Sequence, residues 1–412
     1  MRPLSALLGA IPAWAVLLAI LCTGAGVSIP QAEARPKEAV AKDARLAGDR
    51  GRTRFIADLS KKVDVNVFSL ADPYRVIVDL PEVSFQMPPG LGTEKRGLVT
   101  GYRYGLFAPG KSRIVIDVNG PFLVDKAFVL EARPDQPARL VVDLVATDRT
   151  TFLAKLRASR TPVVGSIPKP KVQAQAPTAA KPVIIIDPGH GGIDPGTSSA
   201  NGVTEKEVVL AFAKTLRQKL EAKGDYQVYL TREGDTFLAL RERVEFAQSK
   251  GANLFVSIHA DSFPKHANEA SGATVYTLSE RASDDEAKEL AAKENFSDAI
   301  AGVELPTDRD EVVANILIDL AQRETQNRSI VFARSVVGEM SAAELHRKSL
   351  KSAGFRVLKS PDVPSVLLEL GFLSNPDDEK QLTSEAWRAA MADKVGDAID
   401  SYFAKRVARM PY

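Results

Sequence analysis

The sequence predicts an all-β sandwich followed by an α/β domain, whose mostly parallel sheet is flanked by helices. Three observations predict this order. Short β-branched runs recur over residues 50–147, a Pro-rich stretch covers residues 159–182, and strand-like and helix-like segments alternate over residues 183–405. Short strands between turn residues are typical of sandwiches, whereas alternating strands and helices are typical of α/β domains.

The composition is that of an ordinary globular protein, with 412 residues of which 45% are hydrophobic and 26% charged. Lys+Arg 54 against Asp+Glu 52 leaves a formal net charge of +2, too balanced for a general nucleic-acid-binding surface. A mean hydropathy of −0.09 excludes a polytopic membrane protein. The single cysteine excludes a disulfide framework and a cysteine-based zinc ribbon.

The N-terminal segment, residues 1–34, has the layout of a secretory signal peptide. A basic residue precedes an apolar run over residues 13–21, and small residues end at Ala34. A membrane anchor is the alternative, but the run is shorter than the ~20 apolar residues that span a bilayer. Leu21 before Cys22 is not the small residue that lipoprotein processing needs. We therefore expect export to a bacterial periplasm and no transmembrane span in the mature chain.

Four runs in the first domain share one pattern, an arginine followed by aliphatic residues and an aspartate. They cover residues 54–59, 75–80, 113–118 and 139–144. Their unequal spacing argues against a solenoid. We expect the charged, Ala-rich residues 35–50 to be a flexible lead-in, and the Pro-rich residues 159–182 to be an extended linker.

In the second domain, the pattern predicts strands at residues 183–186, 227–230, 254–258, 274–277 and 365–370, and helices at 205–223, 238–250, 341–353 and 385–403. His190, His259 and Glu369 lie at or just beyond predicted strand ends, and Glu205 opens a helix. The carboxyl ends of parallel strands are where ligands bind in such sheets. The four side chains are therefore expected to meet.

Two imidazoles and a carboxylate suit Zn²⁺, with one coordination position open for water. The metal would lower the pKa of that water to about 7 and polarise a carbonyl, and a further carboxylate could act as general base. Taken singly, each residue is more often structural: a satisfied histidine, a first-turn helix acid or a buried ion-pair member. Together they favour a catalytic metal site.

Six motifs are shared with a known family. They are Ile186-Asp-Pro-Gly-His-Gly-Gly192, Glu205 within Val-Thr-Glu-Lys, Leu230-Thr-Arg-Glu, Arg243, Ser257-Ile-His-Ala-Asp261 and Leu368-Glu-Leu-Gly-Phe-Leu-Ser-Asn375. On these motifs, residues 183–405 resemble the zinc-dependent N-acetylmuramoyl-L-alanine amidases of bacterial cell division. The resemblance implies His190, Glu205 and His259 as zinc ligands and Glu369 as the catalytic carboxylate. Where the family commonly has Glu-Thr-Gly-Phe, this sequence has Glu369-Leu-Gly-Phe372, so leucine replaces threonine and the glutamate is kept.

Residues 50–147 resemble, more loosely, the AMIN module that precedes such domains and is implicated in septal and peptidoglycan targeting. The resemblance implies a hydrolase that cuts the amide between N-acetylmuramic acid and L-alanine of the stem peptide, during septal wall splitting. Two alternatives stay open: a catalytically silent peptidoglycan-binding scaffold, and another wall-acting zinc peptidase. A catalytically silent protein need not retain both the metal ligands and the general base. This sequence has the three candidate ligands and the candidate base, which favours the enzyme.

An insertion of about residues 280–340 exceeds what a minimal domain needs. A capping box at residues 283–286 predicts a helix to about Asn295, and a second helix begins at about Asp308. The resemblance implies a regulatory helix that occludes the zinc until a LytM-type activator protein displaces it.

Glu286 and Glu289 are the candidate blocking residues in this insertion, with Glu294 behind them; a solvated acidic helix face is the alternative. Asp261 has two candidate roles, orienting a ligand from behind or binding the metal. Four further residues have structural expectations. Arg232 and Arg243 brace the sheet edge or pair with acids, His346 lies on a helix surface or in a groove, and His266 lies in a polar loop.

Overall fold

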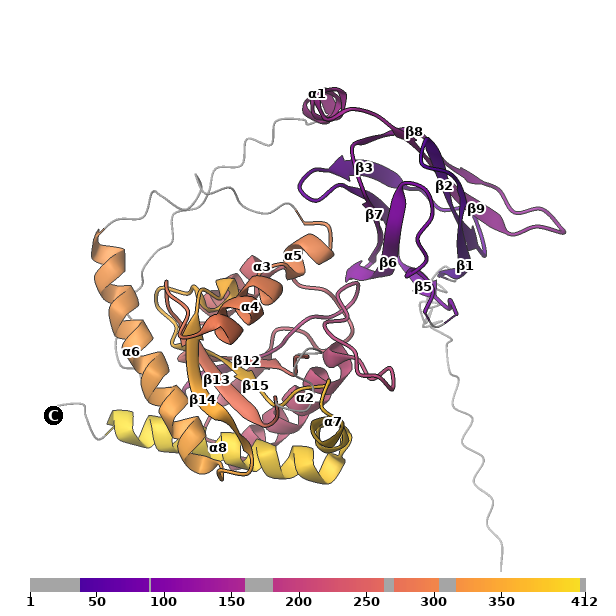
Figure 1. The fold of residues 1–412 in the computed structure, drawn as a ribbon. Coiled ribbons are helices and arrows are strands. Elements are labelled where there is room, and N and C mark those ends of the chain that lie inside the picture. Colours follow the sequence, from indigo (N-terminus) through magenta and orange to yellow (C-terminus); the bar gives the residue numbers. More distant parts are fainter. Residues whose placement is uncertain (1–37, 89, 160–180, 263–269, 304–315, 408–412) are drawn as a thin grey trace, which may run out of the picture. The chain divides into compact units, whose positions relative to one another are not determined.

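The computed structural model describes residues 38–88, 90–159, 181–262, 270–303 and 316–407 (Figure 1). The predicted signal peptide, most of the predicted linker, His266 and the middle of the predicted insertion lie outside these residues. Within the described ranges, each helix falls short of the length or the apolar character that a membrane span requires.

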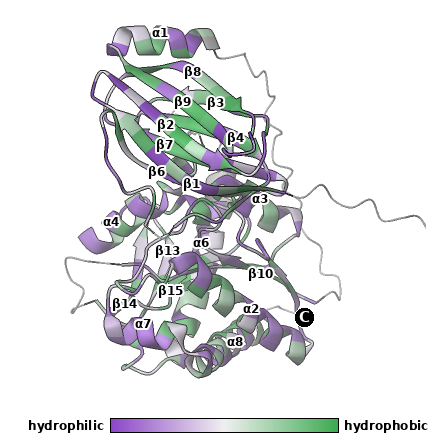
Figure 2. Ribbon diagram, turned by 90° about the vertical axis from the view of Figure 1, so that its right-hand side faces the viewer, coloured by the Kyte–Doolittle hydropathy of each residue, from purple (hydrophilic) through white to green (hydrophobic). Residues whose placement is uncertain are grey.

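The first domain is a sandwich of two sheets, as predicted. One has the order β5-β1-β2-β9-β8 and the other β3-β4-β7-β6. The strands are β1 Ala39–Gly48, β2 Arg52–Leu59, β3 Asn66–Leu70, β4 Arg75–Pro81, β5 Val83–Phe85, β6 Val99–Ala108, β7 Lys111–Val118, β8 Phe122–Leu130 and β9 Ala138–Ala146, followed by helix α1 Arg149–Ser159. Figure 2 shows hydrophobic residues interleaved with hydrophilic ones along these strands.

Strand β1 contradicts the expected flexible lead-in over residues 35–50. It pairs with both β2 and β5, and its small residues Ala39, Ala41 and Ala44 are buried in the sandwich core. Alanine gives a weak hydrophobic signal, so the alternation typical of a strand was hidden among charged neighbours.

The recurring arginine–aspartate pattern has a structural cause. In the antiparallel registers, Arg54 lies opposite Asp143, and Arg113 lies opposite Asp79. In each pair the arginine Nε lies 2.6 Å from a carboxylate oxygen. Opposite charges at facing positions stabilise this register over a slipped one.

The second domain contains a six-stranded mixed sheet of order β11-β10-β12-β15-β13-β14. Its elements are β10 Val183–Pro188, α2 Glu205–Lys223, β11 Gln227–Leu230, α3 Leu240–Ser249, β12 Leu254–His259, β13 Ala273–Leu278, α4 Asp285–Glu294, α5 Ser297–Ile300, α6 Ile316–Glu339, β14 Leu345–Ala353, η2 Arg356–Leu358, β15 Ser365–Glu369, α7 Pro376–Thr383 and α8 Glu385–Val407. Of the five strand pairings in this sheet, the one between β13 and β15 is antiparallel and the other four are parallel.

Helices cover both faces of this sheet, because side chains alternate along each strand. Ile184 and Ile186 of β10 pack in a core with α2, α6 and α8, whereas Ile185 packs on the opposite face with α3 and α4. The sheet is therefore buried on both sides, and its functional groups are confined to the strand ends.

Residues 345–353 form edge strand β14 and not the predicted helix over residues 341–353. The strand pairs in parallel with β13, and its buried residues include His346 and Lys351. Its polar composition suits an exposed helix, so the pairing with β13 overrides the local preference.

Glu344, just before β14, makes the stability of the folded protein depend on pH. Lys394 Nζ lies 2.5 Å from its carboxylate, and the Ser341 hydroxyl and backbone N–H donate to it at 2.7 and 2.8 Å. Burial opposes ionisation, but these bonds outweigh it and lower the pKa of Glu344 from 4.5 to about 2. Because the folded pKa lies below the unfolded one, the stabilisation is present above pH 4.5 and is lost as pH falls toward 2.

We therefore expect Glu344→Gln to lower the free energy of unfolding at pH 7 by roughly 1–2 kcal/mol, a figure reduced for partial solvent screening. Urea denaturation between pH 7 and pH 3 should show the difference from wild type shrinking with pH. Glu324→Gln, which removes an exposed pair with Arg328, is the control with little expected effect. A difference that stays constant with pH would contradict the assignment.

Candidate metal centre

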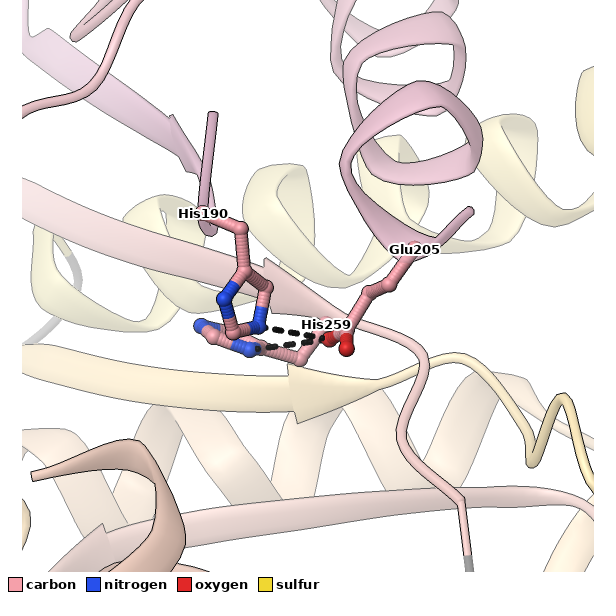
Figure 3. A group of neighbouring side chains, drawn as sticks. All are labelled: His190, Glu205 and His259. Carbon is pink, nitrogen blue, oxygen red and sulfur yellow. Dashed lines mark hydrogen bonds and ion pairs between the residues drawn. The ribbon is translucent and has the colours of Figure 1, made fainter. Parts of the chain in front are cut away.

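Three of the predicted residues meet at the carboxyl ends of β10 and β12. His190 follows β10, His259 ends β12 and Glu205 opens α2, and all three are buried. Each offers one ligand atom, and these atoms lie within 4.8 Å of one another. Figure 3 shows one nitrogen of each histidine ring facing the carboxylate of Glu205.

The contact between His190 and Glu205 fits a shared metal better than a hydrogen bond. Glu205 Oε1 lies 3.1 Å from His190 Nε2 and 3.2 Å from His259 Nδ1. Despite this proximity, the buried His190 Nε2 has no hydrogen-bond partner among the described residues. Two ring nitrogens and a carboxylate oxygen that converge in this way match the donor set of a three-ligand zinc site.

Asp194 orients His190 from behind. Its Oδ2 lies 2.9 Å from His190 Nδ1, which leaves Nε2 to face Glu205. Burial disfavours protonation of His190, but the nearby carboxylates of Glu205, Asp194 and Glu294 outweigh it and raise its pKa. The sequence prediction did not include Asp194. Its position four residues after His190 is the signal that could have identified it as a partner of that histidine.

Two buried arginines brace the loop that carries His190. Arg243 donates to the carbonyls of Pro188 and His190 at 2.9 and 2.7 Å. Arg232 donates to the carbonyls of Pro188 and Gly189 at 3.0 and 2.8 Å. These contacts agree with the bracing role expected for both arginines, and they hold His190 in its uncommon backbone conformation, with φ 57°.

Gly189 is required by the close packing of this loop. A Cβ at this position would lie 2.5 Å from the ring of His259, which is too close for any side chain. The motif has a glycine at position 189 because the segment that carries His190 passes close to the ring of His259.

Glu369 lies beside this group. It ends β15 and pairs in register with His259. Its Oε2 accepts a hydrogen bond of 3.0 Å from the backbone N–H of Asp261, and its buried Oε1 has no partner among the described residues. Burial and the charges of Glu205 and Glu294 raise the pKa of Glu369 well above its ordinary value. A carboxyl group of this kind is suited to carrying a proton.

The glutamate that reaches the histidines is Glu294. Its Oε2 lies 3.2 Å from His259 Nδ1 and 3.5 Å from His190 Nε2. Glu286 instead pairs with Lys351 of β14 at 2.7 Å, and Glu289 is exposed. The structure therefore does not place the two predicted blocking residues at the site.

The reason is the face that α4 buries. Ala287, Leu290, Ala291 and Glu294 are its buried residues, so only the last turn directs a carboxylate toward the histidines. The first turn of α4 lies against β14, where it meets Lys351.

Two further predicted residues are not members of the group of candidate metal ligands. Asp261 pairs with Lys293 of α4 and is absent from the group of convergent ligand atoms found among the described residues. His346 lies in β14, buried against Phe372 with ring centroids 5.7 Å apart, so it does not lie on a helix surface.

Comparison with known proteins identifies both domains. The N-acetylmuramoyl-L-alanine amidase model, Amidase_3, matches residues 184–401, and the AMIN domain model matches residues 43–144. The chain is 33% identical over 370 residues to N-acetylmuramoyl-L-alanine amidase AmiC of Escherichia coli O6:H1, covering 85% of this chain and 87% of that protein. It is 34% identical over 376 residues to AmiC of Neisseria meningitidis serogroup B, covering 87% and 89%.

Other similarities concern the second domain. AmiA of Escherichia coli K12 is 43% identical over 239 residues, which cover 57% of this chain and 80% of that protein. The solved structure of AmiC2 of Nostoc punctiforme is 26% identical, covers 55% of this chain and 99% of that chain, and has a TM-score of 0.40. Since the amidase model spans more than half of the sequence and the AmiC relatives match over most of it, this chain belongs to the N-acetylmuramoyl-L-alanine amidase family, with an AMIN domain before the amidase domain.

Proposed function

We propose that this protein is a zinc-dependent peptidoglycan amidase that cleaves the bond between N-acetylmuramic acid and L-alanine of the stem peptide. The single observation that carries the proposal is the buried convergence of His190, Glu205 and His259 beside Glu369. Family membership supplies the substrate class. The presence of all four groups disfavours a catalytically silent scaffold, and the motif set disfavours another wall-acting zinc peptidase.

His190 Nε2, His259 Nδ1 and a Glu205 oxygen would hold the zinc. When bound, zinc supplies Lewis-acid polarisation of the scissile carbonyl and lowers the pKa of water. Glu369, buried and partly unpartnered, takes a proton from the attacking water and returns it to the leaving nitrogen of L-alanine. Asp194 keeps His190 in the tautomer that presents Nε2.

We further propose that the enzyme is held inactive by α4 and acts in the periplasm at the division septum. Glu294 faces both histidines, where it blocks the position that water must occupy. An activator protein, of the LytM type implied by the sequence resemblance, would displace α4. The AMIN domain is proposed to bring the enzyme to the septum.

Loss of a metal ligand should abolish both metal binding and activity. We expect His190→Ala, like chelation of wild type, to lower activity by at least about a thousandfold, because one of only three protein ligands is lost. Zinc content per chain and release of stem peptide are the measurements. His346→Asn is the matched control, since this histidine lies outside the ligand group and should retain zinc. A zinc-free His190→Ala protein with full turnover would refute metal dependence.

The two domains should be separable in function. We expect deletion of residues 35–158 to leave zinc binding and cleavage of soluble fragments intact, because the second domain has its own core. A fluorescent fusion of this variant should lose enrichment at the septum. Full-length Glu369→Gln, inactive but still septal, is the control that separates localisation from catalysis. A truncated protein that remains septal would assign targeting to another part of the chain.

A further inference from the structure

Asp261 is a buried carboxylate beside the metal site that the proposed chemistry leaves without a task. Its side chain is 1% exposed. Its backbone is fixed on both sides, since its N–H donates to Glu369 Oε2 at 3.0 Å and its carbonyl accepts from Leu373 N–H at 2.7 Å. These two bonds hold the backbone of Asp261 next to the proposed base.

The partner of Asp261 comes from the blocking helix. Lys293 Nζ donates to Asp261 Oδ1, and Lys293 precedes Glu294 in the last turn of α4. The other oxygen, Oδ2, is buried without a hydrogen-bond partner among the described residues. Neighbouring residues of one helix therefore occupy two positions in the site: Glu294 faces the metal ligands and Lys293 faces Asp261.

Displacing α4 would remove the only cation that pairs with Asp261 in the described part of the chain. A buried carboxylate without a partner is strongly unfavourable, so the open site favours a ligand that supplies a hydrogen-bond donor there. The donor must come from a part of the substrate near Glu369, because the backbone N–H of Asp261 donates to Glu369 Oε2 and the Asp261 carboxylate belongs to the same residue.

The stem peptide carries such a donor next to the nitrogen of the bond that is cleaved. Glu369 serves the nitrogen of L-alanine, and the next peptide N–H lies one residue further, about 3.8 Å along the chain. A side-chain ammonium on the third residue lies at least about 7 Å away, so it is further from the nitrogen that Glu369 serves than this N–H is. The amide N–H that follows L-alanine is therefore the donor that fits.

We infer that Asp261 is a substrate-binding residue that accepts the peptide N–H following L-alanine, and that Lys293 occupies this acceptor while α4 is docked. The inference rests on the proposed amidase function and deepens it. It assigns recognition of the stem peptide, and not only of the scissile bond, to a residue of the β12 segment. It also explains why the docked helix excludes peptide as well as water.

Direct peptide binding tests this inference independently of turnover. The full-length, zinc-loaded Lys293→Ala/Glu294→Ala variant frees both positions, and calorimetry with the stem tripeptide that begins with L-alanine measures its affinity. Adding Asp261→Asn to this variant should weaken binding about tenfold to a hundredfold, because the acceptor loses its charge. Zinc content and melting temperature should stay unchanged, since the substitution keeps the shape of the side chain.

A tripeptide whose second-residue N–H is replaced by an ester oxygen identifies the donor. It should bind the Lys293→Ala/Glu294→Ala variant as weakly as the normal tripeptide binds the variant that also carries Asp261→Asn. The two changes together should cost no more than either alone. Unchanged affinity on Asp261→Asn, or effects that multiply, would overturn the inference. If binding follows the expected pattern but no peptidoglycan is cleaved, the proposed function fails and the recognition site stands.

Discussion

Glu369→Gln should abolish turnover while the protein keeps its zinc. The substitution preserves the size of the side chain and the acceptor oxygen that binds the Asp261 N–H, but it removes the group that carries a proton. General acid–base catalysis typically contributes 10²–10⁴-fold, and we expect a loss of kcat near the upper end of about 10⁴-fold, because one carboxylate serves both proton transfers. Stem-peptide release and zinc content on the same preparation are the measurements.

The control for this prediction is Glu344→Gln, the same glutamate-to-glutamine substitution at a residue of the same domain that has no proposed role in proton transfer. It should leave kcat unchanged at pH 7 despite its effect on stability. Comparable turnover of Glu369→Gln and wild type would refute the catalytic role of Glu369. Loss of zinc from Glu369→Gln would instead show that the residue supports the ligands.

Glu294→Ala should raise the basal rate of the purified protein. Its carboxylate faces His190 Nε2 and His259 Nδ1 in the described structure, so its removal frees the position in front of them. If the docked state is favoured by about 1–3 kcal/mol, releasing it raises the active fraction by roughly 5-fold to 150-fold. The assay is the initial rate on purified peptidoglycan without any activator.

Glu289→Ala is the matched control, because Glu289 lies on the same helix but is exposed. It should leave the basal rate unchanged, whereas the sequence alone had favoured Glu286 and Glu289 as the blocking residues. An unchanged rate in a folded, zinc-loaded Glu294→Ala protein would contradict autoinhibition by this residue.

Much of the fold could be predicted because its strands carry strong local signals. The aliphatic runs of β4, β7, β9, β10 and β12 are buried on one or both faces, and the turn residues between them are clear. Strands β1 and β14 could not be predicted. Their residues are small or polar, and they become strands only because a neighbouring strand offers a pairing edge.

The positions of the three candidate metal ligands and of Glu369 could be predicted because each lies at a strand end or a helix start, where the topology of a parallel sheet brings them together. The residues around them depend on packing that the sequence does not display. Asp194 becomes the partner of His190 only through a turn with positive φ, and Glu294 reaches the site only because α4 buries one particular face.

Mass analysis of peptidoglycan digested by the Glu294→Ala protein tests the central claim most directly. The account predicts free stem peptides that begin with L-alanine, together with glycan strands that carry unsubstituted N-acetylmuramic acid. The same digestion with the Glu294→Ala protein that also carries Glu369→Gln should release none. Intact muropeptides, or products that have lost only a terminal alanine, would contradict an amidase acting at the first residue of the stem.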